Sequence, residues 1–149
     1  MAEFKGDAWS DLVKQVERAE KKVPGVFDKA TKAVANRYVV ETQRVMNLMR
    51  IEDTGVLSQS VKSGKIYRTS LGRFVEVWPQ GKRYDKKHKN GERNETIGFV
   101  TIYGRYGRSY KGVLKGATRA RDYQSAADKI AREKAPSDVL KVLEEVFKE

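Results

Sequence analysis

The chain has 149 residues, with 31 Lys or Arg against 20 Asp or Glu, a formal net charge of +11 and no cysteine. This length suits one domain that buries roughly 70% of its unfolded surface. The lack of cysteine excludes disulfides, zinc knuckles and thiolate nucleophiles. The chain has no run of about 18 apolar residues, and its start lacks the apolar stretch of a secretory signal. We therefore expect a soluble, intracellular protein with no membrane partner.

Residues 1–24 predict a short amphipathic helix and a turn. Asp7 is a suitable N-cap, and Pro24 followed by Gly25 ends the helical pattern. The apolar residues behind the cap recur at intervals of three and four, at Trp9, Leu12, Val13 and Val16. We expect this face of the helix to be buried.

A longer helix is predicted from Val26 to about Met49, and its length indicates that it is the central helix of the domain. Its apolar stripe consists of Phe27, Ala30, Val34, Tyr38, Val45 and Leu48. Its polar face consists of Lys29, Lys32, Arg37, Glu41 and Arg44. We expect this polar face to be a solvated surface and not a binding site.

A single helical turn is predicted next. Leu57 and Val61 stand four residues apart, which places them on one face of a turn. Asp53 and Thr54 are the candidate caps for this turn, because their side-chain oxygens accept hydrogen bonds from free backbone N–H groups.

The following residues predict an antiparallel hairpin. The chain extends through Ile66 and Tyr67, and the run 73–78 is rich in β-branched and aromatic residues. Leu71 and Gly72 supply the turn between the two strands. Pro79 ends the second strand because it has no N–H to donate.

Residues 82–121 concentrate the positive charge. They hold 12 Lys or Arg and 3 acids, so about a quarter of the chain carries nine of the eleven net charges. We interpret residues 80–94 (the first basic loop) and 104–121 (the second basic loop) as flexible segments. Such loops are expected to order against an anionic partner or a neighbouring subunit. Between them, residues 96–103 fit a strand and a helix equally well.

The C-terminal region is helical in pattern from Asp122 onward. Pro136 predicts a kink or two separate helices, with Ser137 as the cap of the last one. The expected buried residues are Tyr123, Ala126, Ala127, Ile130 and Ala131, then Val139, Val142, Leu143 and Val146. Residues 1–149 are thus predicted to form a single α+β domain. In it a small antiparallel sheet is packed by a long N-terminal helix and C-terminal helices.

Catalytic chemistry is mostly absent from the sequence. The lone histidine, His88, lies among lysines, without the burial or carboxylate neighbour that tunes a general base. A basic ribonuclease would need Arg83, Tyr84, His88 and Lys89 to form a cleft. The glycine-rich run 103–109 lacks the Gly-Lys-Ser/Thr step of a phosphate loop. We expect no enzyme activity, no cofactor and no metal ion.

A motif around the predicted turn is more informative. Thr54, Gly55, Leu57, Ser60 and Val61 follow the order Thr-Gly-x-Leu-x-x-Ser and then an aliphatic residue. This string resembles a signature of the small bacteriophage tail-completion proteins, also called neck, head-tail joining or tail-terminator proteins. The order of elements is similar to that family from about Val26 to the end of the chain.

Two later segments resemble the same family. Phe99 to Gly104 is similar to an aromatic segment that ends at a glycine, and 120–123 is similar to the Ala-Arg-Pro-Phe step into the last helix. The chain departs from the family pattern at two points: an acid before Gly104 is absent, and Asp122 stands where a proline is expected.

The resemblance implies a structural assembly protein of a phage or of a tail-like particle. Such a protein forms a homo-oligomeric ring, commonly a hexamer, on the head-proximal end of the tail tube. There it contacts the tube and the sheath, connector or collar. It would be found in the host cytoplasm during assembly and then in the virion. The residues expected at its subunit and partner contacts are Arg83, Lys86, Lys87, Arg105, Arg108, Lys111 and Arg119.

A basic nucleic-acid-binding module is the alternative. Tyr103, Tyr106 and Tyr110 alternate with arginines, a pattern that suits bases stacked on rings with cations along the backbone. The same composition is also typical of subunit contacts, where Tyr and Arg are enriched. The sequence by itself leaves both interpretations of these residues open.

Overall fold

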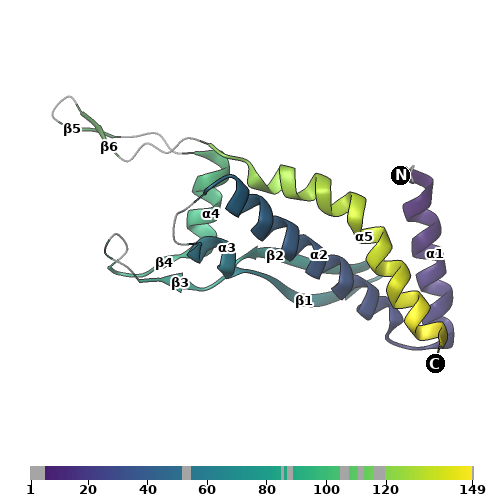
Figure 1. Ribbon diagram of the computed structural model, residues 1–149. Coiled ribbons are helices and arrows are strands. Elements are labelled where there is room, and N and C mark those ends of the chain that lie inside the picture. Colours follow the sequence, from purple (N-terminus) through teal and green to yellow (C-terminus); the bar gives the residue numbers. More distant parts are fainter. Residues whose placement is uncertain are drawn as a thin grey trace.

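The computed structural model describes residues 6–51, 55–84, 86, 89–104, 108–110, 113–115 and 120–148, with the backbone alone at 6–8, 108–110 and 113–115. The protein is α+β, as the sequence predicts. Its body consists of the helices α1 (Gly6–Lys22), α2 (Val26–Leu48) and α5 (Tyr123–Lys148) and the antiparallel strands β1 (Val61–Thr69) and β2 (Gly72–Pro79). Figure 1 shows α2 between α5 and the β1–β2 hairpin, with α1 at one end of the body.

The core has two parts, which follow each other along α2. The first part joins α1, the start of α2 and the end of α5 through Leu12, Val16, Ala19, Val26, Ala30, Val139 and Leu143. The second joins the end of α2 to the helical turn α3 (Val56–Ser60), β1 and the start of α5 through Val45, Met46, Ile51, Leu57, Val61, Tyr123 and Ala127. The predicted apolar stripe of α2 is wrong at its last residue, because Leu48 is 71% exposed where the helix ends.

The junction of α1 and α2 is held by an unexpected carboxylate. Helix α1 begins at Gly6, so the predicted N-cap Asp7 lies inside the helix. Glu20 instead accepts hydrogen bonds from the backbone N–H groups of Phe27, at 2.7 Å, and Gly25, at 3.0 Å. These bonds lower the pKa of Glu20, the Phe27 bond most strongly. Its negative charge at the start of α2 also suits the helix dipole.

The β1–β2 pair confirms the predicted antiparallel hairpin, although Val61, expected in the helical turn with Leu57, is the first residue of β1. Its register pairs Val61 with Pro79 and Tyr67 with Phe74, and an irregularity interrupts it between Ser63 and Ile66. Gly64 lies in that irregularity, and a side chain there would meet the ring of Trp78, since a Cβ would stand 2.8 Å from it. The strand therefore bends where the indole ring lies against its backbone.

Helix α4 (Asn94–Tyr103) resolves the segment that fits strand and helix equally well in sequence. Its start is fixed by the backbone N–H of Asn94, which donates to Gly81 O at 3.0 Å. It ends at Gly104, which has φ 76° and donates its N–H to Val100 O at 2.8 Å. Such a positive φ favours glycine at a helix end.

Gly98 sets the distance between α4 and the body. An added Cβ would lie 2.8 Å from Tyr123 Oη and 3.0 Å from Pro79 Cγ. We expect Gly98→Ala to lower the free energy of unfolding by about 1–2 kcal/mol, because overpacking outweighs the gain in helix propensity. Urea denaturation measures this change. The exposed Thr96→Ala on the same helix is the control, and equal stability of the two variants would contradict this account.

The two basic loops contain short strands, which were not predicted from the sequence. In the first, β3 (Lys82–Arg83) pairs antiparallel with β4 (Glu92–Arg93). In the second, β5 (Arg108–Tyr110) pairs antiparallel with β6 (Val113–Lys115). Each strand has only two or three residues, which is too short for an alternating pattern to be recognised in the sequence.

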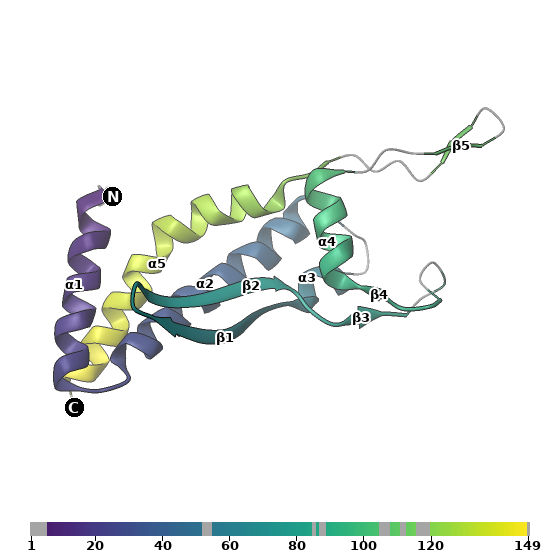
Figure 2. The same cartoon turned by 180° about the vertical axis from the view of Figure 1, so that it is seen from behind.

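Helix α5 is continuous through Pro136, so of the two predicted alternatives, a kink or two separate helices, the second is wrong. The residues buried along it recur at about every fourth position: Tyr123, Ala127, Ala131, Ala135, Val139 and Leu143. Packing of this stripe offsets the roughly 3 kcal/mol that an interior proline costs a helix. Ser137 is no cap, since its hydroxyl donates to Lys134 O at 2.8 Å. Figure 2 shows that α5 bends in its middle.

Candidate interaction surfaces

The motif residues form the joint between α2, α3 and β1. Gly55 is the N-cap of α3 with φ 68°, a conformation that favours glycine. Leu57 and Val61 are each 1% exposed and enter the second core cluster. The Ser60 hydroxyl donates to Leu57 O at 2.6 Å, and the Ser60 carbonyl accepts the N–H of Gln80 at 2.8 Å. These four residues fix the position of the hairpin and offer little surface to a ligand.

Thr54 and Asp53 lie outside the described residues. The N-cap of α3 is Gly55, so the expectation that Asp53 or Thr54 occupies that position is wrong.

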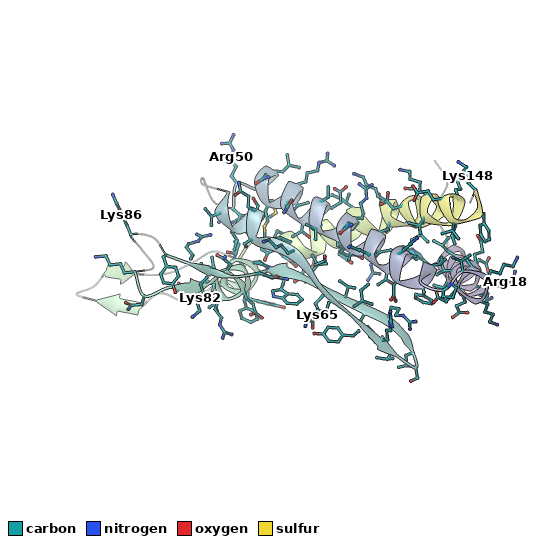
Figure 3. The ribbon with its side chains drawn as sticks, turned by 90° about the horizontal axis from the view of Figure 1, so that it is seen from below. Arg18, Arg50, Lys65, Lys82, Lys86 and Lys148 are labelled. Carbon is teal, nitrogen blue, oxygen red and sulfur yellow. The ribbon has the colours of Figure 1, made fainter. Side chains whose placement is uncertain are left out.

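The seven basic residues predicted at contacts are not gathered into one site. Arg83 is half-buried in β3 opposite Glu92, and Lys86 is exposed. Arg108 lies in β5, where the backbone alone is described. The other four, Lys87, Arg105, Lys111 and Arg119, lie outside the described residues. Figure 3 shows Lys86 pointing outward at one end, while Arg18 and Lys148 lie at the other.

An acidic groove lies between β2, α4 and the start of α5. Its volume is about 470 Å³, within the roughly 300–1,000 Å³ of typical ligand sites. Three carboxylates line it, from Glu95, Asp122 and Asp128. Five aromatic residues also line it: Tyr38, Trp78, Phe99, Tyr103 and Tyr123. Among its described lining residues there is no Lys or Arg, although the chain has 31 of them.

The groove walls are held by short contacts. Tyr38 Oη donates to Asp128 Oδ1 at 2.8 Å, and the Phe99 and Tyr103 rings lie 4.6 Å apart between centroids. Asp122 accepts the N–H and the hydroxyl of Ser125, at 3.0 and 2.6 Å, which lowers the pKa of Asp122. Burial raises the pKa of Tyr123 to about 12, so the phenol stays neutral at the base of the groove.

Comparison with known proteins adds nothing to this picture. No family model, no curated protein and no solved structure matches the chain.

A buried ion cluster between α2 and α5 corrects a further prediction. Glu41, expected on a solvated face, is 1% exposed. Its Oε1 accepts Lys134 Nζ at 2.8 Å and Arg37 Nη1 at 3.4 Å, and Arg44 lies 3.6 Å from Oε2. Arg37 also binds Asp138 through two hydrogen bonds, of 2.6 and 2.9 Å. The cluster couples the two central helices and is a structural feature, because both of its carboxylates are paired with cations of the same chain.

Two arginines connect segments that lie far apart in the sequence. Arg121 donates to the carbonyls of Arg50 and Ile51 at 3.1 and 3.0 Å, so the end of the second basic loop is fixed to the end of α2. Arg73 on β2 donates to Asp28 at 3.0 Å, and its guanidinium lies 5.0 Å from the centre of the Phe27 ring. Sequence reasoning missed both roles, since each pairs residues more than 40 positions apart.

The described part of the chain has no helix long and apolar enough to cross a membrane. Within the same ranges, no group of three or more Asp, Glu or His side chains could hold a metal ion. Of the hypothetical ribonuclease cleft, Tyr84 is exposed and Lys89 is exposed, while His88 lies outside the described residues.

Proposed function

We propose that the protein is a structural assembly protein of a phage or phage-derived tail. Copies of it form a ring, six in number by resemblance to the tail-completion proteins, on the head-proximal end of the tail tube. The ring stops growth of the tube and joins it to the head, connector or collar. No covalent chemistry is required, because surface matching and ring closure carry the function.

The observation that carries this proposal is the placement of the two basic loops. Figure 1 shows β3–β4 and β5–β6 leaving the same end of the body, away from α1 and both labelled termini. A two-stranded pair that projects from a body buries little within its own chain. Two such pairs at one end suit a subunit that binds its neighbours in an assembly. The motif supports the proposal by fixing the hairpin to α2 at that end of the helix.

Tail tubes provide the test of this function. We expect the purified protein to bind one end of tail tubes and to narrow their length distribution in electron micrographs. The variant Lys82→Glu, Lys86→Glu and Lys89→Glu reverses charge in the first basic loop and should abolish this binding. The matched control Lys14→Glu, Lys21→Glu and Lys129→Glu reverses as many charges on α1 and α5 and should bind normally. Bare tube ends with the wild-type protein would contradict the proposal.

Binding of single-stranded nucleic acid is the second candidate. On the hairpin, Tyr67 and Phe74 are cross-strand partners with 52% and 51% exposure, and β1 also carries the exposed Lys62 and Lys65. Exposed rings next to cations can stack bases while cations bind phosphates.

Salt-dependent titration with single-stranded DNA separates a specific site from the non-specific electrostatic attraction between a cationic protein and DNA. A true site gives an affinity well above the background of roughly 10⁻⁴–10⁻⁶ M at physiological salt. It should also lose roughly tenfold or more in affinity in Tyr67→Ala/Phe74→Ala, since a stacked base contributes about 1–3 kcal/mol. Equal weak binding by the wild-type protein and this variant would exclude the candidate.

A further inference from the structure

We propose that the groove between β2, α4 and α5 is the acceptor site for the second basic loop of a neighbouring copy. The inference rests on the proposed self-assembly, and it names the contact through which copies join. The contact is an insertion of Arg and Lys side chains from one copy among the carboxylates and aromatic rings of the next.

The groove has the chemistry that recognises cationic side chains. Glu95 lies in the first turn of α4, and Asp122 and Asp128 lie at the start of α5, so three carboxylates from two elements meet around one space. Carboxylates bind guanidinium groups through charge-assisted hydrogen bonds. Trp78 and Tyr103 add ring faces, which attract cations when the site is shielded from water.

The charge of the groove is the reverse of the charge of the protein. With a net charge of +11, most surfaces of the chain repel a second copy at long range. Arg132, which does not line the groove, already pairs with Asp128 at 3.0 Å, so Glu95 and Asp122 are the lining acids that we expect to attract a cationic segment of another copy. This complementarity favours one defined orientation over random contact.

The second basic loop is the segment with the matching charge. Residues 104–121 hold six Lys or Arg and no acid, whereas the first basic loop contains Asp85 and Glu92. Arg121 is engaged with carbonyls of its own chain. The other cations of this loop are Arg105, Arg108, Lys111, Lys115 and Arg119.

The geometry favours a neighbouring copy over the same chain as acceptor. The second basic loop leaves the body after Tyr103 and returns at Asp122, and both residues line the groove. Figures 1 and 2 show β5 and β6 standing away from the helices and from the β1–β2 hairpin. The strands thus point away from the groove at their own base. A contact between two different surfaces repeats from copy to copy and closes into a ring when the rotation allows it.

Charge reversal in the groove tests the inference. The variant Glu95→Lys/Gln124→Lys places two cations in the groove without touching the bonded carboxylates Asp122 and Asp128. The control Glu133→Lys/Gln15→Lys makes the same change at exposed positions outside it. We expect the groove variant to lose at least roughly tenfold in self-association, measured by light scattering at low salt, where charged contacts are least screened. Association equal to that of the control would overturn the proposal.

A charge exchange identifies the partner segment. Changing Arg105, Arg108, Lys111 and Lys115 to Glu should abolish association, and adding this change to the groove variant should restore it. Failure of the combined variant to associate while it retains the wild-type helical signal in circular dichroism would overturn the assignment of this loop. Tail capping is measured separately from self-association. If the groove variant associates normally and still caps tail tubes, the groove contact is refuted and the proposed function stands. If the combined variant associates again but does not cap tail tubes, the proposed function is refuted and the groove contact stands.

Tryptophan fluorescence gives a reading that does not depend on oligomer formation. The chain has two tryptophans, and Trp9→Phe leaves Trp78 in the groove as the only one. We expect a synthetic peptide of residues 104–121 to change Trp78 emission saturably, with roughly tenfold weaker binding after Glu95→Lys/Gln124→Lys. No change in emission, or equal binding by the groove variant, would overturn the proposal.

Discussion

We expect Leu57→Ala to lower the free energy of unfolding by about 2–5 kcal/mol, the largest effect of any single change in the motif. Leu57 is 1% exposed and packs with Met46, Val61 and Tyr123 in the second core cluster. Its removal leaves a cavity where α2, α3, β1 and α5 meet, so several elements lose contacts together. Urea denaturation followed by circular dichroism measures the change.

Two controls separate this packing effect from a role in binding. Leu57→Met conserves volume and should cost less than about 1.5 kcal/mol. Leu71→Ala removes a side chain that is 91% exposed at the hairpin tip and should change stability by less than about 0.5 kcal/mol. Tail capping by Leu57→Ala should recover at low temperature, where the variant is folded. A folded variant that still fails to cap tubes would show that Leu57 contacts a partner directly.

Long periodic segments were predictable from the sequence. The bounds of α2 and the antiparallel pairing of β1 with β2 agree with the prediction because 23 helical residues and the alternating strand residues each carry a clear apolar pattern. α4 was ambiguous because ten residues that end in five β-branched or aromatic ones fit either period. Pro136 does not divide the C-terminal region into two helices, since the packing of α5 on α2 outweighs a local preference.

The groove and the ion cluster were not predictable from periodic patterns in the sequence. The groove brings together residues from 38 to 128, which no local pattern connects. Glu41 had a signal that was overlooked: it lies three residues after Tyr38 and four before Val45, on the apolar stripe itself. A charge on such a stripe indicates a buried partner, which α5 supplies through Lys134.

We expect Arg37→Met to destabilise the protein by about 3 kcal/mol. Arg37 binds Asp138 through two hydrogen bonds and also reaches Glu41, and both carboxylates are largely buried. Its loss leaves buried negative charge without its main partner, a change that costs about 3–5 kcal/mol in fully buried pairs. The control Arg44→Met removes a 57% exposed partner of the same Glu41 and should cost less than about 1 kcal/mol. Similar losses in both variants would contradict the central role of Arg37.

The same cluster makes stability depend on pH in acid. The hydrogen bonds from Arg37 lower the pKa of Asp138 below its ordinary value of 3.8. Burial opposes the shift at Glu41, but its bonds from Lys134 and Arg37 prevail and lower the pKa below 4.5. Because the unfolded chain binds protons first, this stabilisation is present above about pH 4.5 and is lost as the pH falls through the lower folded values.

Arg37→Met should therefore change the pH profile as well as the stability. We expect the difference in unfolding free energy between the wild-type protein and Arg37→Met to be largest at pH 6–7 and to shrink toward pH 3. In the wild-type protein, acid protonates Asp138 and removes the stabilisation that its ion pair with Arg37 provides; the variant has no such stabilisation to lose. Urea midpoints measured from pH 7 to pH 3 test this, with Arg44→Met as the control that should follow the wild-type curve. A difference that is constant over the whole range would mean that Arg37 stabilises the helices by packing and not by charge.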